Sequence, residues 1–167
     1  YCRMDPLSAE IAKLATNCFL TTKISFANSI GDLAVKAGAN PDKILSAIGS
    51  DSRIGNKYLG YGYGFGGPCF PRDNRAFGKF ANQNEYPLLI SEATDKINDE
   101  HHQFQLNLYL KNFKAEQEIV FDGVAYKKGT SQITESQQLR LAVGLAMAGR
   151  RVLIIDSSEV LDQVEAL

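Results

Sequence analysis

The N-terminal part of the sequence contains one segment that is long and regular enough to constrain the whole fold. Between Pro6 and Pro41 no proline interrupts the chain, and apolar residues recur at the spacing of one helical face. Asp5 can cap such a helix with Pro6 in its first turn, and Gly38 is a suitable C-terminal stop. About thirty residues is long for a helix in a globular domain. We therefore expect this helix to serve two neighbouring elements or a second copy of the chain.

Shorter helices are expected after it, in what we predict to be a helical dimerisation domain over residues 1–112. A short helix follows Asn40 and ends near Gly49, another starts near Asp73, and a third spans roughly 87–111.

A change of pattern then predicts a second, truncated unit over residues 113–167. Strand, helix and strand patterns succeed one another within about 40 residues, which is typical of one βαβ unit with a parallel strand pair. They occupy residues 118–122, 135–149 and 151–156. The predicted fold class is therefore mainly α, with a long central helix, followed by a partial Rossmann-like α/β fragment.

Composition excludes several classes of function. Lys and Arg number 18 against 19 Asp and Glu, so the net charge of -1 provides no basic surface for nucleic acid or an anionic membrane. No apolar run approaches the roughly 20 residues of a membrane span. Three widely spaced cysteines, Cys2, Cys18 and Cys69, fit neither a disulfide framework nor a metal site. We expect a reduced, cytoplasmic protein without metal, nucleic-acid or membrane partners.

Residues 58–67, the glycine-rich loop, lie in a segment without periodicity. The pattern Gly62-x-Gly64-x-x-Gly67 formally matches the dinucleotide-binding fingerprint, which needs a strand before it and a helix directly after it. No strand is predicted before the loop, and two prolines follow it where the helix should open. We therefore assign it no such role. Glycines can instead let the backbone approach a phosphate or a sugar closely.

Cys69 follows the glycine-rich loop and is open to two interpretations. The helix predicted near Asp73 and the neighbouring Arg72 would both favour the thiolate, which is the nucleophilic form. Asp73 could orient a water molecule or simply cap its helix. From the residues alone, a nucleophile and a small buried cysteine beside a capping aspartate are equally supported.

Three blocks of sequence, in a fixed order, cover nearly the whole chain. The first is EIAKLATN (10–17) continued by NSIGD (28–32), the second is DSRIGNKYL (51–59) with GFGGPCFPRD (64–73), and the third is GVAYKK (123–128) followed by Glu135-Ser136. These blocks resemble the UDP-glucose/GDP-mannose dehydrogenase family: its substrate-contacting helix, its catalytic signature and the opening of its C-terminal domain. The Arg-Ile-Gly element at 53–55 favours the UDP-glucose branch.

Members of that family oxidise the C6 alcohol of a nucleotide sugar to a carboxylate, using NAD and a cysteine-bound intermediate. The resemblance implies that Cys69 is the nucleophile and that Lys13 stabilises the developing oxyanion. It also implies that Asn17 holds the sugar or a water molecule and that Asp73 assists proton transfer. Without the resemblance, Lys13 and Asn17 would be interpreted as an ordinary solvated helix face.

Substrate contacts are implied as well. Arg53 is expected to reach the nucleotide-sugar site of a neighbouring subunit, and Lys127 to contact the substrate from the C-terminal part. His101 and His102 match nothing catalytic, and we expect them on a helix surface. The residues implied to wrap the uridine diphosphate are Tyr58, Tyr61, Gly62, Tyr63, Gly64, Phe65 and Gly66.

Two departures from the family pattern matter. The NAD-binding domain that the family carries is not represented, so we interpret the chain as a fragment that dimerises through its long helix, with NAD bound mainly elsewhere. Residues 131–134 read Ser-Gln-Ile-Thr, where the family typically has an acidic pair and then an arginine that contacts the cofactor. A noncatalytic nucleotide-sugar-binding or scaffolding relative therefore remains the alternative.

Overall fold

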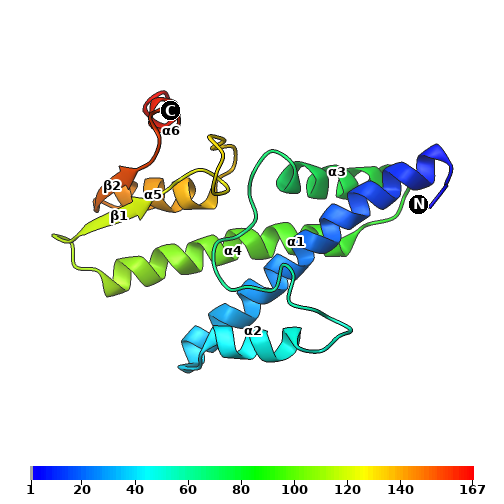
Figure 1. The fold of residues 1–167 in the computed structure, drawn as a ribbon, viewed down its shortest axis with the longest axis horizontal. Coiled ribbons are helices and arrows are strands. Elements are labelled where there is room, and N and C mark those ends of the chain that lie inside the picture. Colours follow the sequence, from blue (N-terminus) through cyan, green and yellow to red (C-terminus); the bar gives the residue numbers. More distant parts are fainter. Residues whose placement is uncertain (1) are drawn as a thin grey trace.

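The computed structural model describes residues 2–167 (Figure 1). Within that range the chain is mainly helical with one two-stranded parallel sheet, so the predicted fold class is confirmed. The elements, in chain order, are α1 (Pro6–Ala37), α2 (Pro41–Gly49), α3 (Phe70–Gln83), α4 (Leu89–Asn112), β1 (Glu118–Asp122), α5 (Gln137–Met147), β2 (Arg151–Ile155) and α6 (Ser158–Glu165).

The long helix α1 is bounded by the predicted caps. The Asp5 side chain accepts a hydrogen bond from the Ser8 amide at 3.0 Å, and Gly38 ends the helix with a φ of 74°. That left-handed conformation favours glycine because it has no Cβ atom. The helix crosses the helical part of the molecule and packs against α2, α3 and α4 (Figure 1).

Two later helices begin at slightly different points from those predicted. Helix α3 begins at Phe70 rather than near Asp73, because Pro71 lies in the first turn, where its missing N–H group is not needed. Helix α4 begins at Leu89 rather than near residue 87.

Helix α4 is long enough to contact α1 and α3 along one part and α5 along another. It thereby links the helical part to the βαβ unit (Figure 1).

The βαβ unit has its own apolar core. Strands β1 and β2 pair in parallel, with Glu118 opposite Arg151 and Asp122 opposite Ile155. Helix α5 packs against β2, and α6 follows as an element that the sequence pattern did not predict. The buried side chains of this core are Ile119, Phe121, Val124, Leu139, Leu141, Ala142, Leu145 and Val160.

The contact between α1 and α4 is largely polar. The hydroxyl of Thr22 lies 3.1 Å from that of Thr94, and the Ser25 hydroxyl donates to the Thr94 carbonyl at 3.1 Å. The other buried residues of these two helices include the polar side chains of Thr21, Asn28, Ser91 and Asn98. Buried polar groups in such a seam must be paired, which fixes the register of the two helices.

The prediction that His101 and His102 lie on a helix surface is wrong. They are only 2% and 5% exposed. The physical reason is the position of α4, because packing against α1, α3 and α5 covers more of its circumference than that of an ordinary surface helix.

Candidate functional site

The centre of the candidate site is Asp73, which lies in the first turn of α3 and receives hydrogen bonds from three side chains. Asn17 donates through Nδ2 at 2.7 Å, Arg72 donates through Nε at 3.2 Å, and Lys13 donates to the same oxygen as Asn17. The Asp73 side chain is 5% exposed, whereas that of Lys13 is 58% exposed. The carboxylate is therefore fixed inside the site, while the ammonium group stays accessible to a ligand.

The electrostatics of Asp73 follow from this arrangement. Burial by itself raises the pKa of Asp73, but the hydrogen bonds from Lys13, Asn17 and Arg72 together hold it below its usual value. The group is thus an ionised carboxylate at neutral pH. An ionised carboxylate can orient the amide of Asn17 and the ammonium of Lys13, and it can accept a proton from a bound water molecule.

Helix geometry explains why α1 supplies two of these donors. Lys13 and Asn17 are four residues apart, so they lie one above the other on one face. The packing of α1 on α3 turns that face toward Asp73. The structure thus brings together Lys13, Asn17 and Asp73, which the family resemblance singled out.

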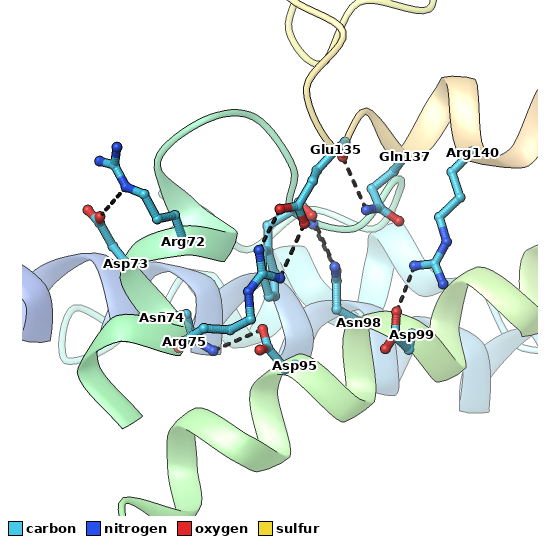
Figure 2. Close-up of polar contacts among 11 residues, drawn as sticks. Arg72, Asp73, Asn74, Arg75, Asp95, Asn98, Asp99, Glu135, Gln137 and Arg140 are labelled. Atoms are coloured by element: carbon cyan, nitrogen blue, oxygen red, sulfur yellow. Dashed lines mark hydrogen bonds and ion pairs between the residues drawn. The ribbon is translucent and has the colours of Figure 1, made fainter. Parts of the chain in front are cut away.

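Cys69 lies at the N-cap position of α3, one turn before Asp73, and its side chain is exposed. Its carbonyl accepts the Asp73 amide at 2.8 Å, which fixes the spacing between the two residues. Cys18 on α1 is the buried cysteine, and burial raises the pKa of its thiol. Arg72 pairs with Asp73 (Figure 2).

The glycine-rich loop is anchored through its backbone. The Gly62 amide donates to Asn28 Oδ1 at 3.1 Å, the Phe65 amide to Asn98 Oδ1 at 2.9 Å and the Gly67 amide to the Thr134 carbonyl at 2.9 Å. Asn98 also donates through Nδ2 to the Phe65 carbonyl at 3.0 Å. The loop is therefore held against α1, α4 and the segment before α5.

This anchoring determines whether the loop can bind the pyrophosphate of a dinucleotide. In a dinucleotide fold the amides of the glycine motif face the pyrophosphate, whereas here the amides of Gly62, Phe65 and Gly67 already donate to protein oxygens. No strand precedes the loop within residues 2–167. The expectation that no helix opens directly after it is wrong, since α3 begins at Phe70. Because three of its amides are already paired and no strand precedes it within residues 2–167, the loop does not fit NAD.

Two of the glycines are required by close packing. A Cβ atom on Gly64 would lie 2.2 Å from Asn98 Oδ1, and one on Gly66 would lie 2.3 Å from the Glu135 carbonyl oxygen. The second contact is with backbone, which cannot rotate away. The loop therefore passes between α4 and the residues before α5 with no room for a side chain.

Two ion pairs connect the helical part to the βαβ unit beside the loop (Figure 2). Arg75 on α3 pairs with Glu135, and Arg140 on α5 donates to Asp99 on α4 at 2.6 Å. All four side chains are substantially exposed, so each pair contributes only about 0–1 kcal/mol to stability. They join α3 to Glu135 and α4 to α5.

The tyrosines of the loop have distinct contacts. Tyr58 has a φ of 62° and stacks edge-to-face on Phe70, next to Cys69, with ring centroids 6.1 Å apart. The Tyr61 hydroxyl donates to Asp32 Oδ1 at 2.8 Å, and burial and that hydrogen bond raise its pKa. Burial also raises the pKa of Tyr63. Tyr58 is thus the loop tyrosine that packs against the start of α3.

Arg53 and Lys127 lie away from the Asp73 cluster. Arg53 is exposed and pairs with Asp51 through Nη2 at 2.6 Å. Lys127 lines a cavity of about 290 Å³ at the carboxyl ends of β1 and β2, together with Asp122 and Asp156.

Within residues 2–167 no group of three or more His, Cys, Asp or Glu side chains is arranged to hold a metal ion. No helix in that range has the length and apolar character needed to cross a bilayer.

The comparisons with known proteins identify the family of the chain. The model of the UDP-glucose/GDP-mannose dehydrogenase family, central domain, matches residues 7–100, which is more than half of the chain. The chain belongs to this family. The match covers nearly all of α1, all of α2 and α3 and the first half of α4, and it includes every residue of the Asp73 cluster.

Individual relatives match the chain over most of its length. The chain is 36% identical over 151 residues to UDP-glucose 6-dehydrogenase TuaD of Bacillus subtilis and 37% identical over 150 residues to UDP-glucose 6-dehydrogenase AglM of Haloferax volcanii. These alignments cover 89% of this chain but 33% and 35% of the relatives, so the chain spans about a third of their length. A solved UDP-glucose dehydrogenase from Pyrobaculum islandicum superposes with a TM-score of 0.87 at 35% identity, covering 98% of this chain and 38% of that one.

Several residues that shape the site had no individual role in the sequence prediction. Asn98 and His101 on α4 hold the glycine-rich loop, but no local pattern marks them. Asn28 and Asp32 on α1 also contact the loop or its tyrosine. For these two a signal existed, because both lie in the NSIGD block that resembles the family helix.

Proposed function

We propose that this chain forms the substrate-binding and nucleophilic part of a nucleotide-sugar dehydrogenase that oxidises the C6 alcohol of a UDP-hexose to the uronic acid. The observation that carries the proposal is the Asp73 cluster: a buried carboxylate that holds Lys13 and Asn17 one helical turn from the exposed Cys69. The names of the relatives support UDP-glucose as the substrate.

The role of Cys69 follows from sulfur chemistry. A thiolate adds to the C6 aldehyde, the new bond being carbon to sulfur, and the carbonyl electron pair moves to oxygen. Lys13 then stabilises this oxyanion as a hydrogen-bond donor. After oxidation of that carbon to a thioester, water attacks the carbonyl, the thiolate leaves and the acid is released. Sulfur suits both steps because it attacks and leaves readily.

Asn17 and Asp73 serve the water step in this proposal. An amide fixed by a carboxylate can position a water molecule, and the ionised Asp73 can take up the proton that water loses on attack. The two oxidations need a hydride acceptor, which the family resemblance implies is NAD. Since the glycine-rich loop does not fit a dinucleotide, we assign NAD no contact within it.

The sugar nucleotide is proposed to lie along the glycine-rich loop. Tyr58 offers an aromatic face next to the start of α3. The amides of Gly62 and Phe65 are paired, whereas those of Gly64 and Gly66 donate to no protein oxygen within residues 2–167. Lys127 is proposed to contact the substrate from the cavity at the ends of β1 and β2. Arg53, exposed on its own chain, is proposed to act on a neighbouring subunit.

A homodimer through α1 completes the proposal. Phe19, Phe26 and Leu33 are exposed and lie at intervals of seven residues, which places them in one stripe along the helix. Large exposed apolar side chains in a row are typical of an interface. The free thiols at Cys2, Cys18 and Cys69 suit the reducing cytoplasm that we propose as the location.

The test is NADH formation from UDP-glucose by the protein that carries this chain, compared with its Cys69→Ser variant. The variant should still bind UDP-glucose but stop before the uronic acid, because an oxygen ester releases its acyl group far less readily than a thioester. Cys2→Ser, at another exposed thiol, is the matched control and should keep the parent rate.

Other outcomes separate the alternatives. Binding of UDP-glucose without NADH formation in any variant would favour the noncatalytic relative, for which the altered segment 131–134 is the motivation. A Cys69→Ser variant that makes the uronic acid at the parent rate would exclude Cys69 as the nucleophile.

A further inference from the structure

A buried histidine holds the middle of the glycine-rich loop. His101 on α4 places Nε2 at 2.6 Å from the carbonyl oxygen of Gly62 and Nδ1 at 2.8 Å from Asp32 Oδ2 on α1. Gln105, one turn further along α4, donates to the same Gly62 carbonyl at 3.1 Å. The imidazole therefore bridges α1, α4 and the loop.

Both ring nitrogens of His101 face oxygen atoms, Nε2 the Gly62 carbonyl and Nδ1 the Asp32 carboxylate. The other oxygen of Asp32 accepts the Tyr61 hydroxyl at 2.8 Å, so both carboxylate oxygens have a partner. A buried side chain whose polar atoms are all paired holds its position more firmly than one with an unpaired group.

The loop needs such an anchor because of its composition. Glycine residues have the largest conformational freedom of any residue, and ordering them when a ligand arrives weakens its binding. Gly62 is fixed on both sides, at its amide by Asn28 and at its carbonyl by His101. The ordering is therefore completed during folding, before any ligand is present.

We propose that His101 is a positioning residue, which with Asp32 holds Gly62 and so keeps the glycine-rich loop in the conformation that binds the sugar nucleotide. This inference rests on the proposed function, because that function assigns the nucleotide sugar to the loop. The competing role for His101 and Asp32 is a link between α1 and α4 that does not affect the loop. Two substitutions at one position distinguish the roles.

Asparagine and glutamine each retain half of the contacts of His101. The amide nitrogen of His101→Gln reaches the position of Nε2, so it can still donate to Gly62 but not to Asp32. The amide nitrogen of His101→Asn reaches the position of Nδ1, so it retains Asp32 but not Gly62. A positioning role requires His101→Asn to be the more damaging change, whereas a link between helices requires the reverse.

The experiment uses the 167-residue chain with two measurements, affinity for UDP-glucose by calorimetry and amide hydrogen exchange of residues 60–66 without ligand. We expect His101→Asn to weaken UDP-glucose binding about tenfold and to speed loop exchange by a similar factor, because the shorter of the two hydrogen bonds to the Gly62 carbonyl is lost. His101→Gln should stay near the parent in both. Glu100→Gln, at the exposed neighbouring position on α4, is the control and should change neither.

A failure of the proposed function and a failure of the positioning role give different results. If the parent chain does not bind UDP-glucose, the proposed function fails for this chain, while the exchange rates still test the anchor. If His101→Asn leaves loop exchange and affinity unchanged, or His101→Gln is the more damaging, the positioning role is wrong. Should His101→Asn not fold, His101→Phe keeps a ring of similar shape that donates to neither partner, and it should speed loop exchange. Unchanged loop exchange in that variant would likewise overturn the proposal.

Discussion

His101 and His102 are neighbours on α4, yet their imidazoles have opposite surroundings. Both ring nitrogens of His101 face oxygen acceptors, whereas Nδ1 of His102 is buried with no hydrogen-bond partner among residues 2–167. Burial, with a further contribution from the charge of Arg140, lowers the pKa of His102 to about 4. One histidine thus has an oxygen partner at each ring nitrogen, and burial favours the neutral form of the next.

His102 should make the stability of the chain depend on pH. Its pKa is about 4 when folded and near 6.5 when unfolded, so between those values the unfolded state binds the extra proton. The contribution is therefore favourable above pH 6.5 and is lost as the pH falls toward 4, by at most about 1.4 kcal/mol per pH unit. Urea unfolding at a series of pH values measures this slope.

Two substitutions isolate the effect of His102. His102→Gln keeps a polar side chain without a titrating group, and His102→Leu removes the unpaired nitrogen as well. Both variants should lose stability more slowly than the parent between pH 6.5 and 4, and His102→Leu should be the more stable of the two at pH 7. Variants with the slope of the parent would show that His102 does not titrate in this range.

The three cysteines should differ in reactivity. Cys69 is exposed at the start of α3, whereas Cys18 is buried and the pKa of its thiol is raised by that burial. Alkylation at neutral pH, followed by peptide mapping, should label Cys69 at least about tenfold faster than Cys18, which reacts only when the structure opens. Cys69 should also react faster than Cys2, the exposed thiol near the N-terminus. Faster labelling of Cys18 would contradict both the packing of α1 and the assignment of the nucleophile.

Local sequence signals were sufficient for α1 but not for the surroundings of His101. The caps at Asp5 and Gly38 act within a few residues, so spacing and residue type alone predict where the helix begins and ends. The partners of His101 are 69 and 39 residues away along the chain. Nothing in the helical pattern of α4 shows which face meets these partners, so the sequence alone predicts a surface position for His101.

The candidate site shows the same limit. The spacing of Lys13 and Asn17 predicts a shared face, but only the packing of α1 on α3 shows that Asp73 lies opposite that face. The family resemblance supplied this grouping where spacing could not. Asn98 carried no signal of either kind, because its role is to hold backbone atoms of a loop 33 residues away.

Gly66→Ala should destabilise the chain through a single backbone contact. The new methyl group would lie 2.3 Å from the Glu135 carbonyl oxygen, so the loop or the segment before α5 must move, at a cost of about 1–3 kcal/mol. Gly60→Ala is the matched control, because a Cβ atom there has no neighbour within 4 Å. Urea unfolding should separate the two variants clearly. Equal stability of both would show that the loop is not confined at Gly66.

The apolar stripe of α1 should hold two copies of the chain together. Phe26 lies between Phe19 and Leu33 in the stripe, so a charge there would be desolvated at the centre of the proposed interface. Sedimentation velocity at micromolar concentration should show a dimer for the parent chain and a monomer for Phe26→Asp. Met147→Asp, at another exposed apolar residue on α5, is the control and should remain dimeric. The monomeric variant should keep the helical circular dichroism of the parent, because Phe26 is not part of the buried core. A parent chain that sediments as a monomer, or a Phe26→Asp variant that sediments as a dimer, would show that the stripe on α1 is not the interface.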